Sequence, residues 1–260
     1  MEGNLSSMLK VLVNGALGRM GQEVVKKIQS EKDLELVAVV DVNPGTAGGL
    51  PVQQDVLAAI KNSQPDVMVD FTKPAVVMNT LRQVLPTGVA CVVGTTGFSK
   101  ENLAEVDALA KANNTAVLVA PNFALGAVVM MKLACEAAKY FPNVEIIEKH
   151  HDQKLDAPSG TALLTAQRIA EVRAKIHQGH PEEKETMAGV RGGDYEGMRI
   201  HSVRLPGYVA SQEVIFGSQG ETLHISTEPV SRECYMPGVA LACRKIKDYK
   251  GLVYGLENIL

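Results

Sequence analysis

Short apolar runs alternate with helix-like segments through the first 120 residues, and this alternation restricts the possible folds more than any other feature of the sequence. The apolar runs are residues 10–14, 36–40, 65–71, 89–93 and 116–119, and the helix-like segments between them are 22–29, 55–61, 75–85 and 100–113. Strands that are apolar throughout and joined by helices form parallel sheets with both faces covered. We therefore expect an α/β fold that begins with a Rossmann-type parallel sheet, whose ligands bind at the carboxyl ends of the strands.

A glycine-rich turn joins the first expected strand to the first expected helix. It consists of Gly15, Ala16, Leu17, Gly18, Arg19, Met20 and Gly21. This GxxGxxG spacing differs by one residue from the common GxGxxG pattern. Gly15 and Gly18 would let backbone N–H groups approach a pyrophosphate at the positive end of the helix, and Gly21 would let helix and strand pack closely. Many glycine turns bind nothing, but the strand before and the helix after this one favour a dinucleotide site.

An acidic residue stands where a ribose partner is expected. Asp41 follows the second apolar run and lies twenty residues after Gly21. A carboxylate there accepts hydrogen bonds from two ribose hydroxyls and repels a 2′-phosphate, and neither Val42 nor Asn43 carries a guanidinium to bind that phosphate. The alternative is a cap at the end of a strand. We expect NADH to be favoured over NADPH, although Arg19 or Lys73 leaves use of both open.

The regular alternation stops at residue 125, which predicts a second domain of a different class. A long helix is expected at 125–140, a polar glycine-rich excursion at 177–197, and strands at 198–205, 208–216 and 221–227, with a hairpin turn at 217–220. Further helices are expected at 233–244, except at Pro237-Gly238, and at 252–260. We therefore expect a dinucleotide-binding domain at 1–121, completed by 232–260, and an α+β domain with a mixed or antiparallel sheet at 122–231.

Composition excludes several classes of function. The net charge is −3 without a cluster of basic residues, and six Tyr, five Phe and no Trp offer few surfaces for stacking bases, so nucleic acid is not an expected ligand. The apolar runs are shorter than the roughly 18 residues of a membrane span, and we expect a cytoplasmic protein. The four cysteines are widely spaced without a CxxC pair, which indicates reduced thiols and neither disulfides nor a zinc site.

The segment 148–162 concentrates the residues with the most chemical potential. It holds His150, His151 and Lys154, followed by Ser159-Gly160-Thr161 at the expected start of a helix over 162–175. Three interpretations remain open on residue types alone. The first is a solvated loop. The second is a metal site at His150, His151 and Asp152, which the nearby ammonium of Lys154 disfavours. The third is a site that binds a carboxylated substrate beside a proton donor.

The same segment resembles a family signature. Its sequence, E-K-H-H-D-Q-K-L-D-A-P-S-G-T-A, is similar to E-x-H-H-x-x-K-x-D-A-P-S-G-T-A of the dihydrodipicolinate reductases of lysine and diaminopimelate biosynthesis. Every fixed position matches. Further markers of that family are the glycine turn, Asp70-Phe71-Thr72, Gly94-Thr95-Thr96-Gly97 and Ala120-Pro121-Asn122-Phe123. The resemblance covers essentially the whole chain.

The resemblance implies a reaction and a role for each matching residue. It implies reduction of 4-hydroxy-tetrahydrodipicolinate, a cyclic imine dicarboxylate, to tetrahydrodipicolinate by NADH or NADPH, in a homotetramer joined through 198–227. His150 matches the acid/base and Lys154 the proton donor. The implied carboxylate contacts are His151, Ser159, Gly160 and Thr161. The implied cofactor contacts are Gly15 to Gly21, Asp41, Gly94, Thr95, Thr96, Ala120, Pro121, Asn122 and Phe123.

One departure from the family pattern concerns the cofactor. Many relatives have an arginine directly after the position of Asp41, and this chain has Val42.

Two other functions remain as alternatives. The first is another two-domain NAD(P)-dependent dehydrogenase of amino acids or imines. The second is a sensor that binds NAD(H) without turnover.

Overall fold

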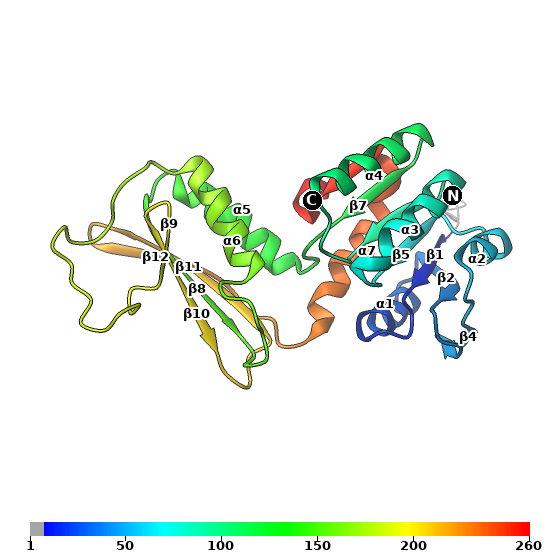
Figure 1. Cartoon of the computed structure of the whole chain (residues 1–260), viewed down its shortest axis with the longest axis horizontal. Helices are drawn as coiled ribbons and strands as arrows, with labels where there is room; N and C mark the ends of the chain where they lie inside the picture. Colours follow the sequence, from blue (N-terminus) through cyan, green and yellow to red (C-terminus); the bar gives the residue numbers. More distant parts are fainter. Residues whose placement is uncertain (1–7) are drawn as a thin grey trace, which may run out of the picture. The chain divides into compact units, whose positions relative to one another are not determined.

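The computed structural model describes residues 8–260, and their contacts divide the chain into two compact units (Figure 1). Unit 1 comprises residues up to Ala124 together with Tyr235–Leu260, and unit 2 comprises Leu125–Cys234. The chain therefore leaves the first unit and returns to it. Each unit has its own sheet and its own buried core.

Unit 1 is a parallel sheet, as the alternation of strands and helices predicts. Its strands, in spatial order, are β13 (Gly251–Tyr254), β7 (Ala116–Val119), β6 (Ala90–Val93), β5 (Val67–Asp70), β1 (Leu9–Asn14) and β2 (Leu34–Val40). All neighbouring pairs in this order are parallel. A short antiparallel pair, β3 (Thr46–Ala47) and β4 (Leu50–Pro51), follows β2.

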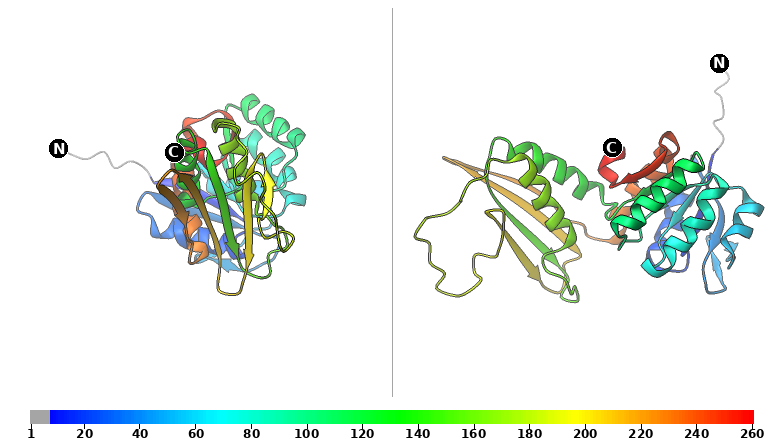
Figure 2. Two further views of the ribbon diagram at one scale, coloured as in Figure 1. Left: turned by 90° about the vertical axis from the view of Figure 1, so that its left-hand side faces the viewer. Right: turned by 45° about the horizontal axis from the view of Figure 1, so that its top comes forward.

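Helices cover both faces of this sheet (Figures 1 and 2). They are α1 (Arg19–Ser30), α2 (Val56–Ser63), α3 (Pro74–Val84), α4 (Lys100–Ala112) and α7 (Met236–Lys245), with short 3₁₀ turns at Leu85–Thr87 and Ile246–Asp248. Leu12 and Met68 belong to the core cluster beneath α2, α3 and α4. Their neighbours Val11, Val13 and Val67 are buried as well, and successive residues of a strand point to opposite faces. Burial on both faces explains why these strands are apolar throughout.

Two predictions at the end of the chain were wrong. Residues 252–260 do not form a helix, because β13 pairs in parallel with β7 and Gly255, at φ +89°, separates it from a 3₁₀ turn at Leu256–Ile259. Leu252-Val253-Tyr254 has the branched and aromatic residues that favour a strand. Pro237 does not interrupt α7, because it lies in the first turn, where a helix needs no backbone N–H donor. A 3₁₀ turn at Arg232–Tyr235 precedes the helix.

Unit 2 is a mixed sheet with helices on one face, so the expected α/β plus α+β fold class is confirmed. Its strands, in spatial order, are β12 (Glu221–Thr227), β11 (Ala210–Ser218), β8 (Asn143–His150), β10 (Met198–Arg204) and β9 (Gly193–Tyr195). β8 and β10 are parallel and the other neighbouring pairs are antiparallel. Helices α5 (Leu125–Ala138) and α6 (Gly160–Val172) pack on each other and on the sheet (Figure 2).

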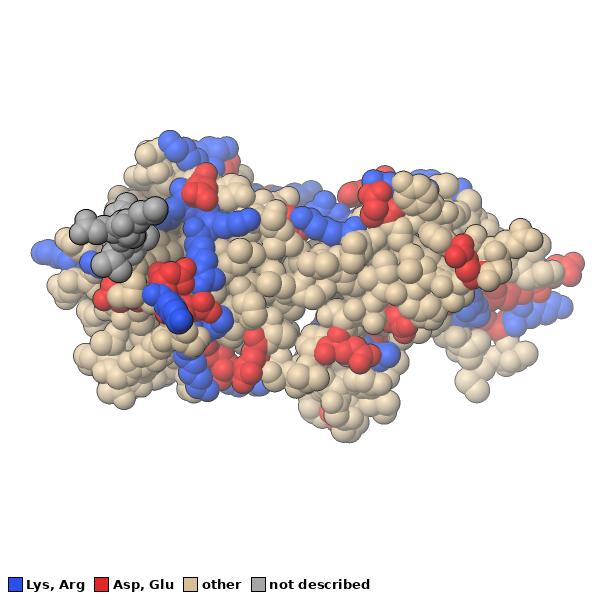
Figure 3. All heavy atoms as spheres, turned by 180° about the vertical axis from the view of Figure 1, so that it is seen from behind, with Lys and Arg blue, Asp and Glu red and all other residues tan. Residues whose placement is uncertain are grey.

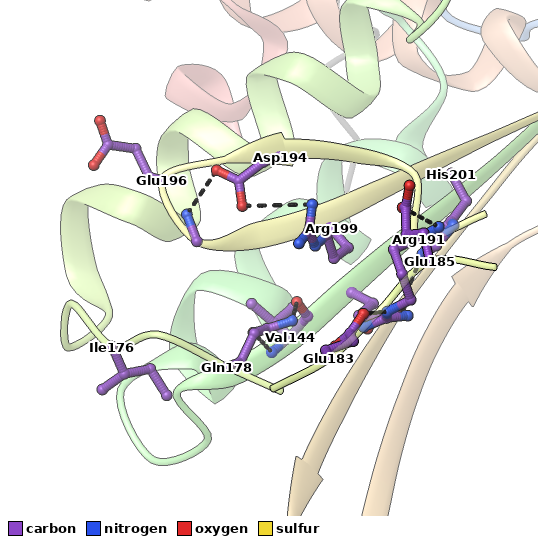
Figure 4. Close-up of polar contacts among 12 residues, drawn as sticks. Val144, Ile176, Gln178, Glu183, Glu185, Arg191, Asp194, Glu196, Arg199 and His201 are labelled. Atoms are coloured by element: carbon purple, nitrogen blue, oxygen red, sulfur yellow. Dashed lines mark hydrogen bonds and ion pairs between the residues drawn. The ribbon is translucent and has the colours of Figure 1, made fainter. Parts of the chain in front are cut away.

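The excursion expected at 177–197 is held against unit 2 by polar contacts (Figure 4). The side chain of Gln178 accepts a hydrogen bond from the N–H of Val144 and donates one to its carbonyl, each at 3.0 Å. Arg173, which caps α6 and is almost fully buried, donates to the carbonyls of Pro142, Ile176 and Glu196. None of residues 177–197 is buried, so polar contacts such as these hold the excursion in place.

Charges of both signs are intermixed on the face shown in Figure 3. Within unit 1, several charged residues form pairs. Arg244 of α7 binds Asp33 at 2.7 Å, and Lys247 binds Asp66 at 2.6 Å, so the returning end of the chain is tied to residues near its start. Within residues 8–260, no helix is long and apolar enough to cross a membrane.

Candidate functional site

The glycine turn of unit 1 has a backbone that only glycine can form at two positions. Gly15 has φ +80°, and a Cβ there would lie 2.8 Å from the carbonyl oxygen of Phe71. A Cβ at Gly21 would lie 2.0 Å from the carbonyl oxygen of Gly15, so α1 starts directly against the turn. Gly18 is the N-cap of α1, and no side chain among the described residues caps that helix start. Its first N–H groups are therefore free to bind an anion.

Asp41 lies beside this turn. One carboxylate oxygen accepts from the backbone N–H of Leu17 at 3.0 Å, and the other accepts from the N–H of Asn43 at 3.1 Å. A carboxylate offers about four lone-pair positions, so capacity remains for further donors. Val42, the next residue, is 78% exposed, so the side chain beside Asp41 is apolar and uncharged.

The buried carboxylate of Asp70, to which the sequence assigned no role, forms hydrogen bonds with the neighbouring loops. Asp70 is fully buried at the end of β5 and accepts from the side chains of Asn14 at 2.8 Å and Thr95 at 3.0 Å. It also accepts from the N–H and the hydroxyl of Thr72, at 3.0 and 2.8 Å. The ends of β1, β5 and β6 therefore share one anionic centre. The signal in the sequence was an acid that ends an apolar run.

The two remaining segments predicted for the cofactor lie next to each other. The rings of Phe71 and Phe123 are 5.8 Å apart, and a Cβ at Gly94 would lie 2.1 Å from the ring of Phe71. The N–H of Ala120 donates to the carbonyl of Val93 at 3.0 Å. The structure thus brings 94–97 and 120–123 together at the carboxyl ends of β6 and β7. Thr95 is buried with its hydroxyl donated to Asp70, whereas Thr96 is exposed.

In unit 2, the predicted acid/base His150 stands at the end of β8 and contacts a buried carboxylate. Glu148 is fully buried, and one of its oxygens lies 2.5 Å from His150 Nδ1. Residues two apart on a strand share a face, which brings these two side chains together. Arg204, paired with His150 in the register between β10 and β8, donates twice to Glu148, at 2.7 and 2.8 Å.

The carboxylate of Glu148 is held in its charged form. Burial by itself would raise the pKa of Glu148, but hydrogen bonds from His150, Arg204 and Ser202 outweigh burial and lower the pKa to about 2. The same carboxylate raises the pKa of Arg204. Sequence analysis named neither residue as a site residue. Glu148 was detectable as a charge at the third inward-facing position after Val144 and Ile146, but Arg204 lies 56 residues away and gave no signal.

The start of α6 is fixed to this same carboxylate. The N–H of Ser159 donates to Glu148 at 3.2 Å, and the Ser159 hydroxyl accepts from the N–H of Ala162 at 3.1 Å. Helix α6 therefore begins at Gly160, two residues earlier than the sequence suggested. Around Gly160 an added Cβ would meet nothing within 4 Å. The space around Gly160 at the start of α6 is thus open, and helix starts are positions where anions bind.

Lys154 and His151 lie on the loop between β8 and α6. Lys154 Nζ donates to the carboxylate of Asp156 at 2.7 Å, and this pairing lowers the pKa of Asp156. Arg204 donates to the backbone carbonyl of Asp156 at 2.7 Å, so the loop is linked to Glu148. His151 is exposed. Within residues 8–260, no group of three or more His, Cys, Asp or Glu side chains is arranged to hold a metal ion.

Comparison with known proteins covers both units. The family model described as the N-terminus of dihydrodipicolinate reductase matches residues 9–123, and the model of its C-terminus matches residues 126–260. A 4-hydroxy-tetrahydrodipicolinate reductase of Listeria innocua is 52% identical over 97% of this chain and 100% of its own. Another from Streptococcus pneumoniae is 50% identical over 97% of this chain and 99% of its own.

Solved structures agree with the sequence relatives. A dihydrodipicolinate reductase from Paenisporosarcina sp. TG-14, solved with dipicolinate bound, has a TM-score of 0.91 and 46% identity over 97% of this chain and 100% of its own. An amine dehydrogenase from Mycobacterium smegmatis, at 14% identity and a TM-score of 0.63 over 96% and 95% of the two chains, shares the fold alone. The resemblance seen in the signature at 148–162 is confirmed, and this chain belongs to the dihydrodipicolinate reductase family of oxidoreductases.

Proposed function

We propose that this chain reduces 4-hydroxy-tetrahydrodipicolinate to tetrahydrodipicolinate in the synthesis of diaminopimelate and lysine. The observation that carries the proposal is the set of contacts around Glu148, which joins His150, the loop of Lys154 and the open start of α6 in a chain about half identical to reductases of that name. The reaction adds one hydride and one proton to the ring and releases one water. Two carboxylates on the substrate account for several cationic and N–H donors in one place.

Unit 1 is the proposed cofactor-binding unit. The free N–H groups at the start of α1, next to Gly15, Gly18 and Gly21, would hold the pyrophosphate, and Asp41 would accept from the adenosine ribose. The nicotinamide side is assigned to 94–96 and 120–123, which Asp70 and the Phe71–Phe123 contact keep in place. A bound nicotinamide supplies the hydride.

Unit 2 is the proposed substrate-binding unit. Ser159, Gly160 and Thr161 at the start of α6, with His151, are assigned to the substrate carboxylates. His150 and Lys154 are assigned to the proton that the ring takes up after hydride addition, because both side chains carry exchangeable protons next to that helix start. We also propose that copies of the chain associate as a tetramer through 198–227, where β12 is the edge of the sheet and residues 221–224 are exposed. Light scattering during size-exclusion chromatography tests this.

The proposed reaction is tested with the aldol product of pyruvate and aspartate semialdehyde, generated enzymatically in the cuvette. We expect loss of NADH absorbance, with a lower KM for NADH than for NADPH because Asp41 repels a 2′-phosphate and Val42 cannot bind it. Kinetics with NADPH that equal or exceed those with NADH contradict the cofactor preference. Binding of NADH without consumption identifies a sensor instead.

The role of Lys154 has its own test. Lys154→Ala should lower kcat by about 10²-fold or more, the size associated with loss of a general acid. Lys175→Ala is the control, because Lys175 is an exposed lysine of the same unit that pairs only loosely with Glu196 at 3.5 Å. Wild-type kcat in Lys154→Ala would remove Lys154 from the mechanism.

A further inference from the structure

The carboxylate of Glu148 is fully enclosed, and hydrogen-bond donors of His150, Ser159, Ser202 and Arg204 surround it. One oxygen accepts from the N–H of Ser159 and from Arg204, at 3.2 and 2.7 Å. The other accepts from Arg204 at 2.8 Å and lies 2.5 Å from His150 Nδ1. Below we call Glu148, His150 and Arg204 the inner cluster. None of its contacts requires a bound ligand.

These contacts determine which nitrogen of His150 carries a proton. An ionised carboxylate can only accept hydrogen bonds, so the nitrogen 2.5 Å from Glu148 must be an N–H donor. In the neutral imidazole the proton therefore lies on Nδ1, and Nε2 has a free lone pair. Nε2 can then take up a proton and give it away again while Nδ1–H stays bonded to Glu148.

We infer that Glu148 is a positioning residue for the reduction, which keeps His150 in its Nδ1–H form so that Nε2 carries the transferred proton, and which orients the loop of Lys154 through Arg204. The inference rests on the proposed function of His150 and Lys154. After hydride addition, the His150 imidazolium gives its Nε2 proton to the electron-rich ring and returns to the neutral Nδ1–H form. Uptake of one proton from water restores it.

The link to Lys154 runs through two residues. Arg204 uses one nitrogen to bind both Glu148 and the backbone carbonyl of Asp156, each at 2.7 Å. The carboxylate of the same Asp156 accepts from Lys154 at 2.7 Å. The Ser159 N–H bond attaches the other end of the loop to Glu148. Hydrogen bonds to the Glu148 carboxylate therefore hold in place both groups assigned to proton transfer and the start of α6.

The same strand supplies a matched control. Glu145, which we group with His201 and Arg191 as the outer cluster, lies 2.8 Å from His201 Nε2 and 2.7 Å from Arg191. Its side chain is on the opposite face of β8 and is 31% exposed. The outer cluster binds the 177–197 excursion to the sheet, as Figure 4 shows for Arg191 and His201, and none of its residues is assigned to the reaction.

Replacing Glu148 by glutamine tests the inference because the amide has one accepting and one donating end. With its oxygen toward the N–H of Ser159, its NH₂ faces His150 and one nitrogen of Arg204. In the opposite orientation the NH₂ faces two donors, the Ser159 N–H and Arg204, so this orientation is less favourable. In the favoured orientation Nδ1 must accept, so the neutral imidazole becomes the Nε2–H tautomer and can no longer take up a proton at Nε2.

The experiment combines kinetics with ¹⁵N NMR of histidine-labelled protein at a pH where the imidazole is neutral, with the His150 signals assigned from His150→Gln. We expect Nδ1–H in the wild type and Nε2–H in Glu148→Gln. The variant should also lose about 10²-fold in kcat with KM for NADH unchanged, the size of a lost general acid. Glu145→Gln should leave the His150 tautomer and kcat as in the wild type.

The outcomes separate the inference from the proposed function. A wild type that consumes neither NADH nor NADPH with the substrate refutes the proposed function, whatever the tautomer. A wild type that turns over, with a Glu148→Gln variant that loses kcat but keeps Nδ1–H, refutes the positioning role alone, as does a variant with unchanged kcat. If Glu148→Gln does not fold, Glu148→Asp decides, since its carboxylate should keep Nδ1–H and an Nε2–H form there refutes the inference.

Discussion

Two clusters of the same composition, each built around a glutamate of strand β8, lie in different surroundings, and the difference shows which cluster can take part in the reaction and which holds a loop in place. The inner cluster (Glu148, His150, Arg204) lies on the helix-covered face, where Glu148 is fully buried. The outer cluster (Glu145, His201, Arg191) lies on the other face, with 31% of the Glu145 side chain exposed. A buried carboxylate needs hydrogen-bond donors from the protein, whereas an exposed one can use water.

This difference decides what each cluster can do. Because the inner cluster cannot exchange its partners for water, it fixes the orientation of His150, Ser159 and the Asp156 backbone to each other. The outer cluster joins a long excursion to the sheet, and its bonds can open without leaving a buried charge unpaired. Burial, and not the identity of the residues, makes one glutamate a positioning residue and the other a tether.

The largest expected effect separates the two histidines. His150→Gln should lower kcat by about 10²-fold or more, because it removes the group that we propose to carry the proton. His201→Gln should leave kcat unchanged, since His201 bonds to Glu145 of the outer cluster, away from the residues assigned to the reaction. Steady-state kinetics with NADH and the enzymatically generated substrate measure both. Equal losses in the two variants would break the distinction between the clusters.

The second effect is on stability. Glu148→Ala should lower the free energy of unfolding by about 3–5 kcal/mol, because it leaves the Arg204 charge without its buried partner. Glu145→Ala should cost no more than about 1 kcal/mol, as partly exposed pairs usually do. Urea unfolding followed by circular dichroism gives both values. A small loss in Glu148→Ala would mean that water reaches Arg204 and that the inner cluster is not closed.

The third effect is a dependence of stability on pH. The pKa of Glu148 is lowered from 4.5 to about 2 in the folded chain. Its carboxylate therefore stabilises the fold above pH 4.5, and this contribution is lost as the pH falls toward 2. Linkage gives roughly 3 kcal/mol at neutral pH, of which roughly 2 kcal/mol is lost by pH 3.

Urea unfolding between pH 6 and pH 3 isolates this contribution. The difference in unfolding free energy between the wild type and Glu148→Gln should shrink as the pH falls below 4.5, because Glu148 is then protonated in the unfolded wild type while the folded chain still holds it charged. The pKa of Glu145 is also lowered, by Arg191 and His201 against the effect of burial, so Glu145→Gln should change the same curve in the same direction. A difference for Glu148→Gln that is constant with pH would contradict the low pKa.

The same comparison shows how far the sequence could predict the site. The signature at 148–162 placed His150, Lys154 and Ser159 within one segment, and contacts with Glu148 inside that segment join His150 to Ser159. The loop of Lys154 is linked to Glu148 through Arg204. Arg204 comes from another strand, and the spacing between residues says nothing of strand register. Asp70 and Asn14 are also 56 residues apart and meet only because β1 and β5 are neighbours.

The fold was predictable where local pattern and tertiary packing agree. The strands of unit 1 could be predicted because burial on both faces makes them apolar throughout. The hairpin turn before β12 could be predicted because it requires a glycine, Gly220, at φ +81°. The end of the chain was not predictable in this way. Leu252-Val253-Tyr254 is too short for its periodicity to separate strand from helix, and pairing with β7 decides the outcome.

The smallest expected effect, the response to salt, sharpens the comparison further. At 1 M NaCl the screening length is about 3 Å, which weakens attractions between solvated charges but hardly affects pairs that solvent cannot reach. The stability difference between the wild type and Glu145→Gln, at most about 1 kcal/mol at low salt, should therefore fall toward zero, while the difference for Glu148→Gln should stay constant. Urea unfolding at 0.05 and 1 M NaCl compares the two. Because salt also changes the stability of the wild type, only the two differences are informative, and a parallel decrease in both would mean that solvent reaches the inner cluster and that its burial cannot set the tautomer of His150.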